Sequence, residues 1–299
     1  MSFASAELTG AEVLALPDAV VQDRWRRRLH AVPSLRAQRF LVEHADVGGE
    51  PLAAAVAAVR PGQTGQIYSL ATAPTHRQRG MATALLARLE ARLVDAGCAA
   101  VQAVYRTDLR SLVAVETVLA KRGWDPSRPA QYLFRGTATV LDTPTFQNLT
   151  LPDGCTLFDW AALTLRDQAA LEAEVGRSIP RVLSPFQQPD RLDAACSVGA
   201  RCGGVVAGWM LLHRTGPEGL RQYTSLWVRP DFVGTSLALV LLRTAIERHA
   251  AATPDGAGLF EVDAGNRVML NLARRRLRLI PEVTLRVAGK RLRPDRVGF

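Results

Sequence analysis

The feature that most constrains the fold of this chain is a strand, loop and helix pattern that occurs twice, 156 residues apart. Residues 66–73 are rich in β-formers and end before Pro74, and a turn and a long helical stretch follow. A shift of 156 places Pro74 on Pro230 without a gap. The same shift relates further pairs, namely Gln66 and Gln222, Leu70 and Leu226, Ala82 and Ala238, Leu85 and Leu241, and Leu86 and Leu242. A long internal repeat predicts two copies of one structural unit.

The length of 299 residues also fits two domains of ordinary size. Prolines and turn formers gather at Asp142-Thr143-Pro144-Thr145, and again at Pro152-Asp153-Gly154 before a new strand at Cys155. We therefore predict a first domain over residues 1–142 and a second over residues 150–299. Strands alternate with helices in both, which favours an α/β fold with a mixed sheet.

The run Arg77-Gln78-Arg79-Gly80-Met81-Ala82 joins the first strand to a helix expected from Met81 to Ala96. A small-residue turn at a helix N-terminus places unpaired backbone N–H groups around one point, and the helix dipole adds positive potential there. The spacing differs from the dinucleotide fingerprint, which needs Gly at three fixed positions and an acidic partner further on. The run therefore predicts a phosphate site.

The order of elements around this run resembles the GNAT acyltransferase superfamily. A strand over 99–105, a helix over 109–122 and the pair Gly123-Trp124 follow the loop and its helix, as in that family. The resemblance implies two tandem GNAT-like domains, a layout similar to that of mycothiol synthases, and acetyl-CoA or another acyl-CoA as co-substrate. A glycine-containing turn in an unrelated α/β unit is the alternative.

In this family the loop binds the pyrophosphate of the coenzyme, and a bulge in the preceding strand leaves backbone groups for the pantetheine arm. Carried over residue by residue, the resemblance gives these coenzyme-binding positions: Leu70, Ala71, Thr72, Arg77, Gln78, Arg79, Gly80, Met81, Ala82 and Thr83.

The second copy departs from this pattern, because Val233 replaces the basic first residue and Ser236 replaces the central glycine. Loss of the arginine removes a charge-assisted contact, and a Cβ hinders the approach of phosphate to the backbone. We expect the N-terminal copy to hold the coenzyme and the C-terminal copy to be degenerate. The alternative is that Gly234 and Ser236 are small enough for binding to persist.

Both copies also lack the acid and base that the resemblance implies. Gln66 and Gln222 stand where the family has a glutamate that activates the acceptor amine. Leu119 and Arg275 stand where many members have a tyrosine that acts as the general acid. Acyl transfer from a thioester can proceed by placement and carbonyl polarisation, because thiolate is a good leaving group.

Three side chains of the N-terminal copy remain catalytic candidates. Gln66 and Tyr68 share a strand face by parity, so Tyr68 could orient a nucleophile or protonate the leaving sulfur. Tyr105 at the end of the next strand is the third. The alternative for either tyrosine is a ring packed in the core with its hydroxyl at the edge.

The sequence thus favours an acyltransferase that moves an acyl group, most simply acetyl, from coenzyme A to a small-molecule or peptide amine. One alternative is a catalytically silent acyl-CoA-binding or scaffold protein. Another is an enzyme that takes a longer acyl chain, from coenzyme A or from an acidic acyl carrier protein.

Composition limits the other classes. The chain is 48% hydrophobic and has a net charge of +9, but it contains no apolar run long enough to span a membrane and no visible signal peptide. We interpret the basic clusters 24–28 and 274–276 as solvated helix faces, and nucleic acid binding is not expected. The scattered histidines predict no metal. The four cysteines lack disulfide or zinc spacing, so we expect reduced thiols and a cytoplasmic location.

Overall fold

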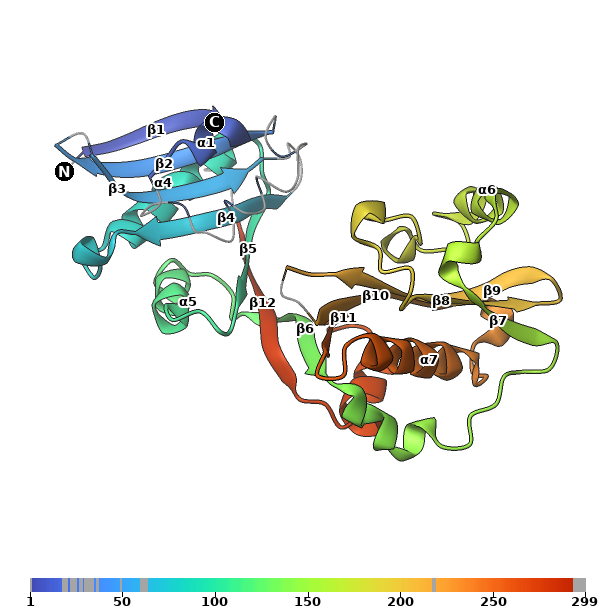
Figure 1. Cartoon of the computed structure of the whole chain (residues 1–299). Coiled ribbons are helices and arrows are strands. Elements are labelled where there is room, and N and C mark those ends of the chain that lie inside the picture. The colour runs from blue at the N-terminus through green and yellow to red at the C-terminus, as the bar shows by residue number, and fades with distance from the viewer. Residues whose placement is uncertain are drawn as a thin grey trace. The chain divides into compact units, whose positions relative to one another are not determined.

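The computed structural model describes residues 2–17, 21, 26, 29, 35, 38–48, 50–59, 64–216 and 219–292. Compact packing divides the chain into two units (Figure 1), one formed by Met1–Ala130 with Thr284–Phe299 and the other by Gln131–Val283. We call them unit 1 and unit 2. The basic cluster at 24–28 lies outside the described residues except for Arg26. None of the described helices is long and apolar enough to cross a membrane.

The sheet of unit 1 has the strand order β1-β2-β3-β4-β5-β12. Its elements are β1 (Ser2–Thr9), α1 (Gly10–Leu14), β2 (Arg39–Val47), β3 (Glu50–Ala58), β4 (Thr64–Thr72), the short 3-10 helix Pro74–His76, α4 (Met81–Asp95), β5 (Ala100–Arg106), α5 (Leu112–Lys121) and the pairing part of β12 (Pro281–Arg291). Neighbouring strands are antiparallel except for β4 and β5, which are parallel.

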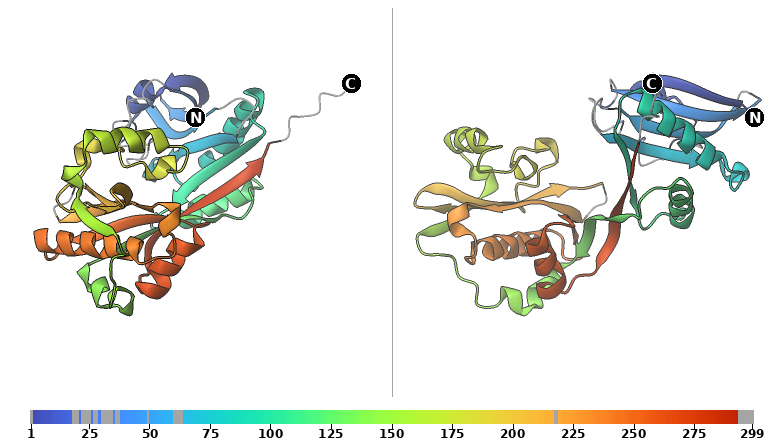
Figure 2. Two further views of the ribbon diagram at one scale, coloured as in Figure 1. Left: turned by 90° about the vertical axis from the view of Figure 1, so that its right-hand side faces the viewer. Right: turned by 180° about the vertical axis from the view of Figure 1, so that it is seen from behind.

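Helix α4 covers one face of this sheet, as Figure 2 shows. Leucines recur along it at helical spacing, and Leu85, Leu86, Leu89 and Leu93 are all fully buried against the alanines of β3 and against β4 and β5. This apolar stripe fixes the helix, and therefore its N-terminus, relative to the end of β4. Gly123, with φ +70°, follows the C-cap of α5 and ends that helix, and Trp124 is buried in the same core.

The sheet of unit 2 has the order β6-β11-β10-β9-β8-β7. Its elements are β6 (Arg128–Gly136), the 3-10 turns Ala138–Asp142 and Pro144–Phe146, β7 (Cys155–Asp159), α6 (Leu165–Glu174), β8 (Val198–Cys202), β9 (Val205–Arg214), β10 (Leu220–Val228), the 3-10 helix Pro230–Phe232, α7 (Leu237–Ala252), β11 (Ala257–Asp263), α8 (Arg267–Asn271) and a π-helical turn at Leu272–Arg276. In Figure 1, α7 lies along one face of β8–β10 and α6 on the other.

The internal repeat is confirmed at the level of elements. Strands β4 and β10 start 156 residues apart and have equal length, and the 3-10 helices and the starts of α4 and α7 keep the same offset. Both strands pair in parallel with the strand that follows their helix. The tandem α/β layout expected from the sequence is therefore present, and element ends differ from expectation by a few residues, most at α5.

The division into compact units differs from the linear division at 142 and 150 expected from the repeat. Strand β6 follows α5 in sequence, but it pairs with β11 of unit 2 over Gln131 to Gly136. The last strand, β12, pairs with β5 of unit 1 over Leu285 to Arg291. Each half of the sequence thus supplies a terminal strand to the other unit, an exchange that local sequence patterns do not reveal.

The expectation that all four cysteines are reduced thiols was wrong. Cys155 and Cys202 form a disulfide, with 4.1 Å between their Cα atoms. They lie directly opposite each other on the paired strands β7 and β8. Their 47-residue separation in sequence gave no sign of this pairing. Cys98 and Cys196 are buried free thiols.

Candidate functional site

The loop between β4 and α4 has the backbone geometry of an anion site. Gln78 and Gly80 both have positive φ, at 63° and 77°, and residues 77–80 are exposed. Gly80 is the N-cap of α4, and no side chain caps the first turn of this helix. The N–H groups at the start of α4 therefore remain for a ligand, and the dipole of this helix of 15 residues favours a negative one.

Arg77 lies against the end of β4, because its Nε donates to the carbonyl oxygen of Thr72 at 3.2 Å. Thr72 is one of the positions expected to meet the pantetheine arm. Met81 is buried beneath the loop and is only 2% exposed, whereas Ala82 and Thr83 are partly buried. The loop and helix start are thus brought together as expected, with Met81 as a packing residue.

Strand β4 carries the bulge that the resemblance implies. Its register with β3 shifts between the pairs Val56–Ser69 and Ala57–Ile67, so Tyr68 is the extra residue. On the other edge, the parallel pairing with β5 runs from Thr64 to Ile67 and ends there. Strands β4 and β5 therefore separate beyond Ile67, which opens the sheet on the side of the anion loop.

Gln66 and Tyr68 lie near this opening. Gln66 accepts a hydrogen bond from Gln102 Nε2 on β5 at 2.7 Å, so two amides face each other across the last paired residues. The ring of Tyr68 packs edge-on against Phe40, with 5.7 Å between centroids, on a core distinct from that beneath α4. The amide of Gln66 and the phenol of Tyr68 can both donate and accept hydrogen bonds, so this pair can position a substrate.

Tyr105 lies on the opposite side of the sheet, in the core beneath α4 and α5. Its hydroxyl donates to Glu116 Oε1 on α5 at 3.3 Å. Burial raises the pKa of Tyr105, which keeps the phenol protonated at neutral pH. Leu119, which stands at the family's acid position, is buried in the same core.

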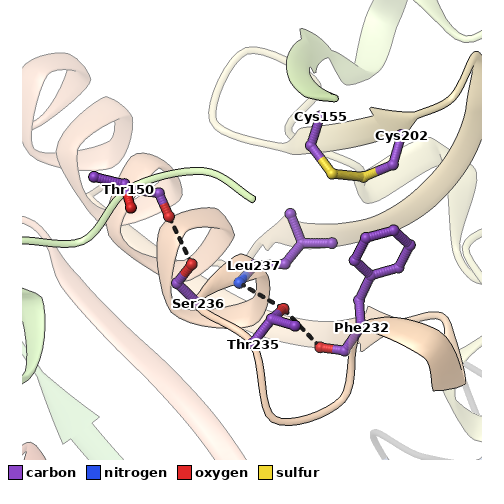
Figure 3. Close-up of a disulfide and its surroundings, with 7 residues drawn as sticks. All are labelled: Thr150, Cys155, Cys202, Phe232, Thr235, Ser236 and Leu237. Atoms are coloured by element: carbon purple, nitrogen blue, oxygen red, sulfur yellow. Dashed lines mark hydrogen bonds between the residues drawn. A yellow bond between two sulfur atoms is a disulfide. The ribbon is translucent and has the colours of Figure 1, made fainter. Parts of the chain in front are cut away.

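In unit 2 the corresponding loop is closed by its own chain. Ser236 has φ −70°, so it lacks the left-handed conformation of Gly80, and its Oγ donates to the carbonyl oxygen of Thr150 at 2.6 Å. The backbone N–H of Leu237 donates to Thr235 Oγ1 at 3.3 Å. Figure 3 shows Thr150 against Ser236 at the start of α7, with the disulfide of Cys155 nearby. Thr235 thus engages one N–H at the start of α7, and the Ser236 side chain holds Thr150 beside it.

Unit 2 nevertheless keeps an opened sheet. The register of β10 with β9 shifts at Thr224, 156 residues after Tyr68, and the pairing with β11 ends at Gln222. A cavity of about 190 Å³ lies there, lined by residues of β10, β11, α7, α8 and the segment 136–140. Sequence reasoning missed this cavity.

Two polar residues at the cavity wall were also missed. Tyr223 donates to His249 Nδ1 at 3.1 Å, and His249 Nε2 lies 3.2 Å from the carbonyl oxygen of Gly219. The repeat offset could have revealed them, because it aligns Tyr223 with Ile67 and His249 with Leu93, both apolar core residues. Burial lowers the pKa of His249 and raises that of Tyr223, so both are neutral at pH 7.

Comparison with known proteins agrees with this geometry. Residues 11–115 match the family model described as "Acetyltransferase (GNAT) family". No curated protein sequence matches the chain at a significant level.

Solved structures similar to this one include a tandem GNAT protein from the clavulanic acid biosynthesis pathway, with 18% identity, a TM-score of 0.65 and coverage of 98% of this chain and 100% of that one. A GCN5-related N-acetyltransferase from Sphaerobacter thermophilus has 22% identity, a TM-score of 0.61 and coverage of 98% and 96%. A GNAT-family acetyltransferase from Colwellia psychrerythraea has 11% identity, a TM-score of 0.56 and coverage of 97% and 99%. At these identities the likeness concerns the fold.

Proposed function

Because this chain carries a GNAT acetyltransferase domain and has the fold of tandem GNAT proteins, we propose that it is an N-acyltransferase whose N-terminal copy takes an acyl group, most simply acetyl, from coenzyme A. The acceptor is an amine of a small molecule or peptide, and longer acyl groups or an acidic acyl carrier protein remain alternative donors. The proposal needs no metal. The cytoplasmic location was expected from reduced thiols, and the Cys155–Cys202 disulfide removes that argument.

The observation that carries this proposal is the contrast between the two loops. Gly80 has positive φ at an uncapped helix start, whereas Ser236 is held by Thr150 and the following turn is occupied by Thr235. Coenzyme should therefore bind once per chain, with its pyrophosphate at residues 77–82 and its pantetheine arm along Leu70, Ala71 and Thr72.

In this proposal the reaction relies on the positioning of its two substrates, and no carboxylate acts as general base. Gln66 and Gln102 can orient the amine at the opening between β4 and β5, and the amine loses its proton to water. Tyr68 and Tyr105 are the two candidates to protonate the leaving thiolate. Tyr105 has the raised pKa of a phenol that keeps its proton, and Tyr68 shares the face of Gln66.

Calorimetry of acetyl-CoA binding tests the coenzyme site. Gly80→Val should weaken binding at least ten-fold, because it strains a positive φ and places a branched Cβ where phosphate approaches. Gly97→Val is the matched control, since Gly97 also has positive φ, 79°, and open space around its Cα, but lies at the other end of α4. Two equal sites in the wild type, or equal losses in both variants, would contradict the proposal.

Turnover is tested by release of free thiol from acetyl-, malonyl- and longer acyl-CoA with a panel of amines. We expect the rate to rise with pH toward the pKa of the amine, and Gln66→Glu to extend activity to lower pH by supplying a base. Replacement of the tyrosine that acts as the acid by Phe should lower kcat about ten-fold, which corresponds to roughly 1.4 kcal/mol. Binding without thiol release from any donor would instead support a silent acyl-CoA-binding protein.

A further inference from the structure

The cavity of unit 2 has the size of a small-molecule site. Its volume is about 190 Å³, and a dry cavity of roughly 150 Å³ can hold a benzene ring. Most of its wall is apolar, with Met210, Leu242, Ile246, Phe260 and Met269 among the lining residues. A ligand with an aromatic or branched aliphatic body would fill it.

The charges at this cavity have one sign. Glu261 and Asp263 of β11 line it, and none of its described lining residues is an arginine or a lysine, although the whole chain has a net charge of +9. Asp263 Oδ1 accepts from the backbone N–H of Gly265 at 2.7 Å, and within the described part of the chain Glu261 makes no hydrogen bond or ion pair. Both residues are exposed and alternate along β11 with Phe260 and Val262 of the core, so a cationic group can meet them only at the edge of the cavity.

The polar pair in the wall also offers an acceptor. Because the carbonyl of Gly219 can only accept, His249 carries its hydrogen on Nε2 and accepts through Nδ1 from the Tyr223 hydroxyl. The hydrogen of that hydroxyl is therefore used, and the phenol oxygen retains lone pairs. A ligand group that donates hydrogen bonds fits this wall better than one that accepts them.

Coenzyme A fits this cavity poorly. The acidic side chains repel its phosphates, and Thr235 Oγ1 already accepts from the N–H of Leu237 at the helix start where a pyrophosphate would bind. Two glycines of the wall leave room for the side chains of Tyr223 and His249. A Cβ at Gly258 would lie 2.5 Å from the Tyr223 ring, and one at Gly256 would lie 2.7 Å from His249.

We propose that this cavity binds a small apolar molecule that carries a protonated amine, with the apolar body between α7 and β11 and the ammonium group near Glu261 and Asp263. Such binding requires no acyl transfer, and it would persist if unit 1 were inactive. It gives the C-terminal copy a ligand of its own in place of the coenzyme.

Calorimetry with three probes of matched shape tests this ligand class on the full chain. The probes are 2-phenylethylamine, 2-phenylethanol and 3-phenylpropionate at pH 7. We expect the amine to bind at least five-fold more tightly than the alcohol and the carboxylate to bind most weakly. Equal affinities, a preference for the carboxylate, or no binding of any of the three would overturn the proposal.

Variants locate the site. Glu261→Gln with Asp263→Asn should remove the preference for the amine while leaving the alcohol unaffected. Both positions are exposed, and Asn keeps an Oδ1 acceptor for the N–H of Gly265. Glu172→Gln on α6, also exposed but outside the cavity, is the matched control. Met269→Trp should fill the cavity and weaken the binding of every probe that binds.

Acetyl-CoA binding measured on the same samples separates this proposal from the proposed function. Met269→Trp should leave coenzyme binding unchanged, which also shows that the variant folds. Loss of coenzyme binding in Gly80→Val should leave the amine affinity unchanged. Amine binding that survives Met269→Trp in a folded variant, or that is insensitive to the carboxylate changes, would place the ligand elsewhere and refute the site.

Discussion

At the scale of single residues, the two copies of the repeat differ at the loop before the helix and in the wall behind it. Gly80 and Ser236 occupy the same place in the repeat, yet one has positive φ and the other is bonded to Thr150. Ile67 and Leu93 are core hydrophobes, and their counterparts Tyr223 and His249 form a polar pair at a cavity.

Two buried histidines of unit 2 should make its stability depend on pH. Burial lowers the pKa of both His213 and His249 below 6.5, so the unfolded chain binds protons at a higher pH than the folded chain does. Their contribution to stability is therefore complete above about pH 6.5 and is lost as pH falls below it.

Urea unfolding at pH 7.5 and 5.5 measures this effect, with the fluorescence of the stacked pair Trp209 and Trp227 as the probe of unit 2. The variant His213→Gln with His249→Gln should be less stable at pH 7.5 but should show a smaller difference between the two pH values. An unchanged difference would mean that other groups titrate.

At the scale of elements, one carboxylate ties α4 to the last strand. Glu90 of α4 is 5% exposed and accepts from Trp124 Nε1 at 2.8 Å, from Arg122 at 2.7 Å and from Lys290 of β12 at 2.7 Å. The cluster joins α4, the turn after α5 and β12, so it fixes the exchanged strand in unit 1.

We expect Glu90→Gln to destabilise unit 1 by about 3 kcal/mol, because it leaves the ammonium of Lys290 partly buried without its counter-charge. Thermal unfolding followed by circular dichroism measures the loss. Asp95→Asn is the control on the same helix, since Asp95 is exposed. A shift no larger than that of the control would show that the cluster contributes little.

The disulfide should stabilise unit 2 against unfolding. It closes a loop of 47 residues between adjacent strands, and such cross-links typically contribute about 2–4 kcal/mol. A reducing agent should therefore lower the unfolding midpoint of the wild type at the Trp209 signal. In Cys155→Ser with Cys202→Ser, the midpoint should already be low and should not respond to the reductant. A wild type that does not respond would show that the bond is absent or without effect.

At the scale of the whole molecule, the strand exchange makes each half of the sequence incomplete. Strand β6 belongs to the N-terminal half of the sequence but pairs in unit 2, and β12 belongs to the C-terminal half but pairs in unit 1. A half expressed alone would leave the edges of β5 and β11 without these partners, and exposed edges promote aggregation.

Fragments 1–147 and 148–299 should therefore co-purify when expressed together, with a tag on one fragment only. The break falls beside exposed residues Gln147 and Asn148, so it removes little packing. Each fragment alone should be largely insoluble. Fragments that are soluble and monomeric separately would show that the exchanged strands are dispensable.

The sequence by itself determined the repeat, the α/β layout and the loop at residues 77–82, because periodicity, prolines and turn residues act on neighbours in the chain. It also identified Ser236 as a departure from that loop. Only the tertiary structure decided which strands pair, that Cys155 meets Cys202, that Tyr105 and Tyr68 lie on opposite sides of the sheet, and where a cavity remains. These features join residues far apart in sequence, and strand pairing and packing are chosen by the whole chain rather than by a local pattern.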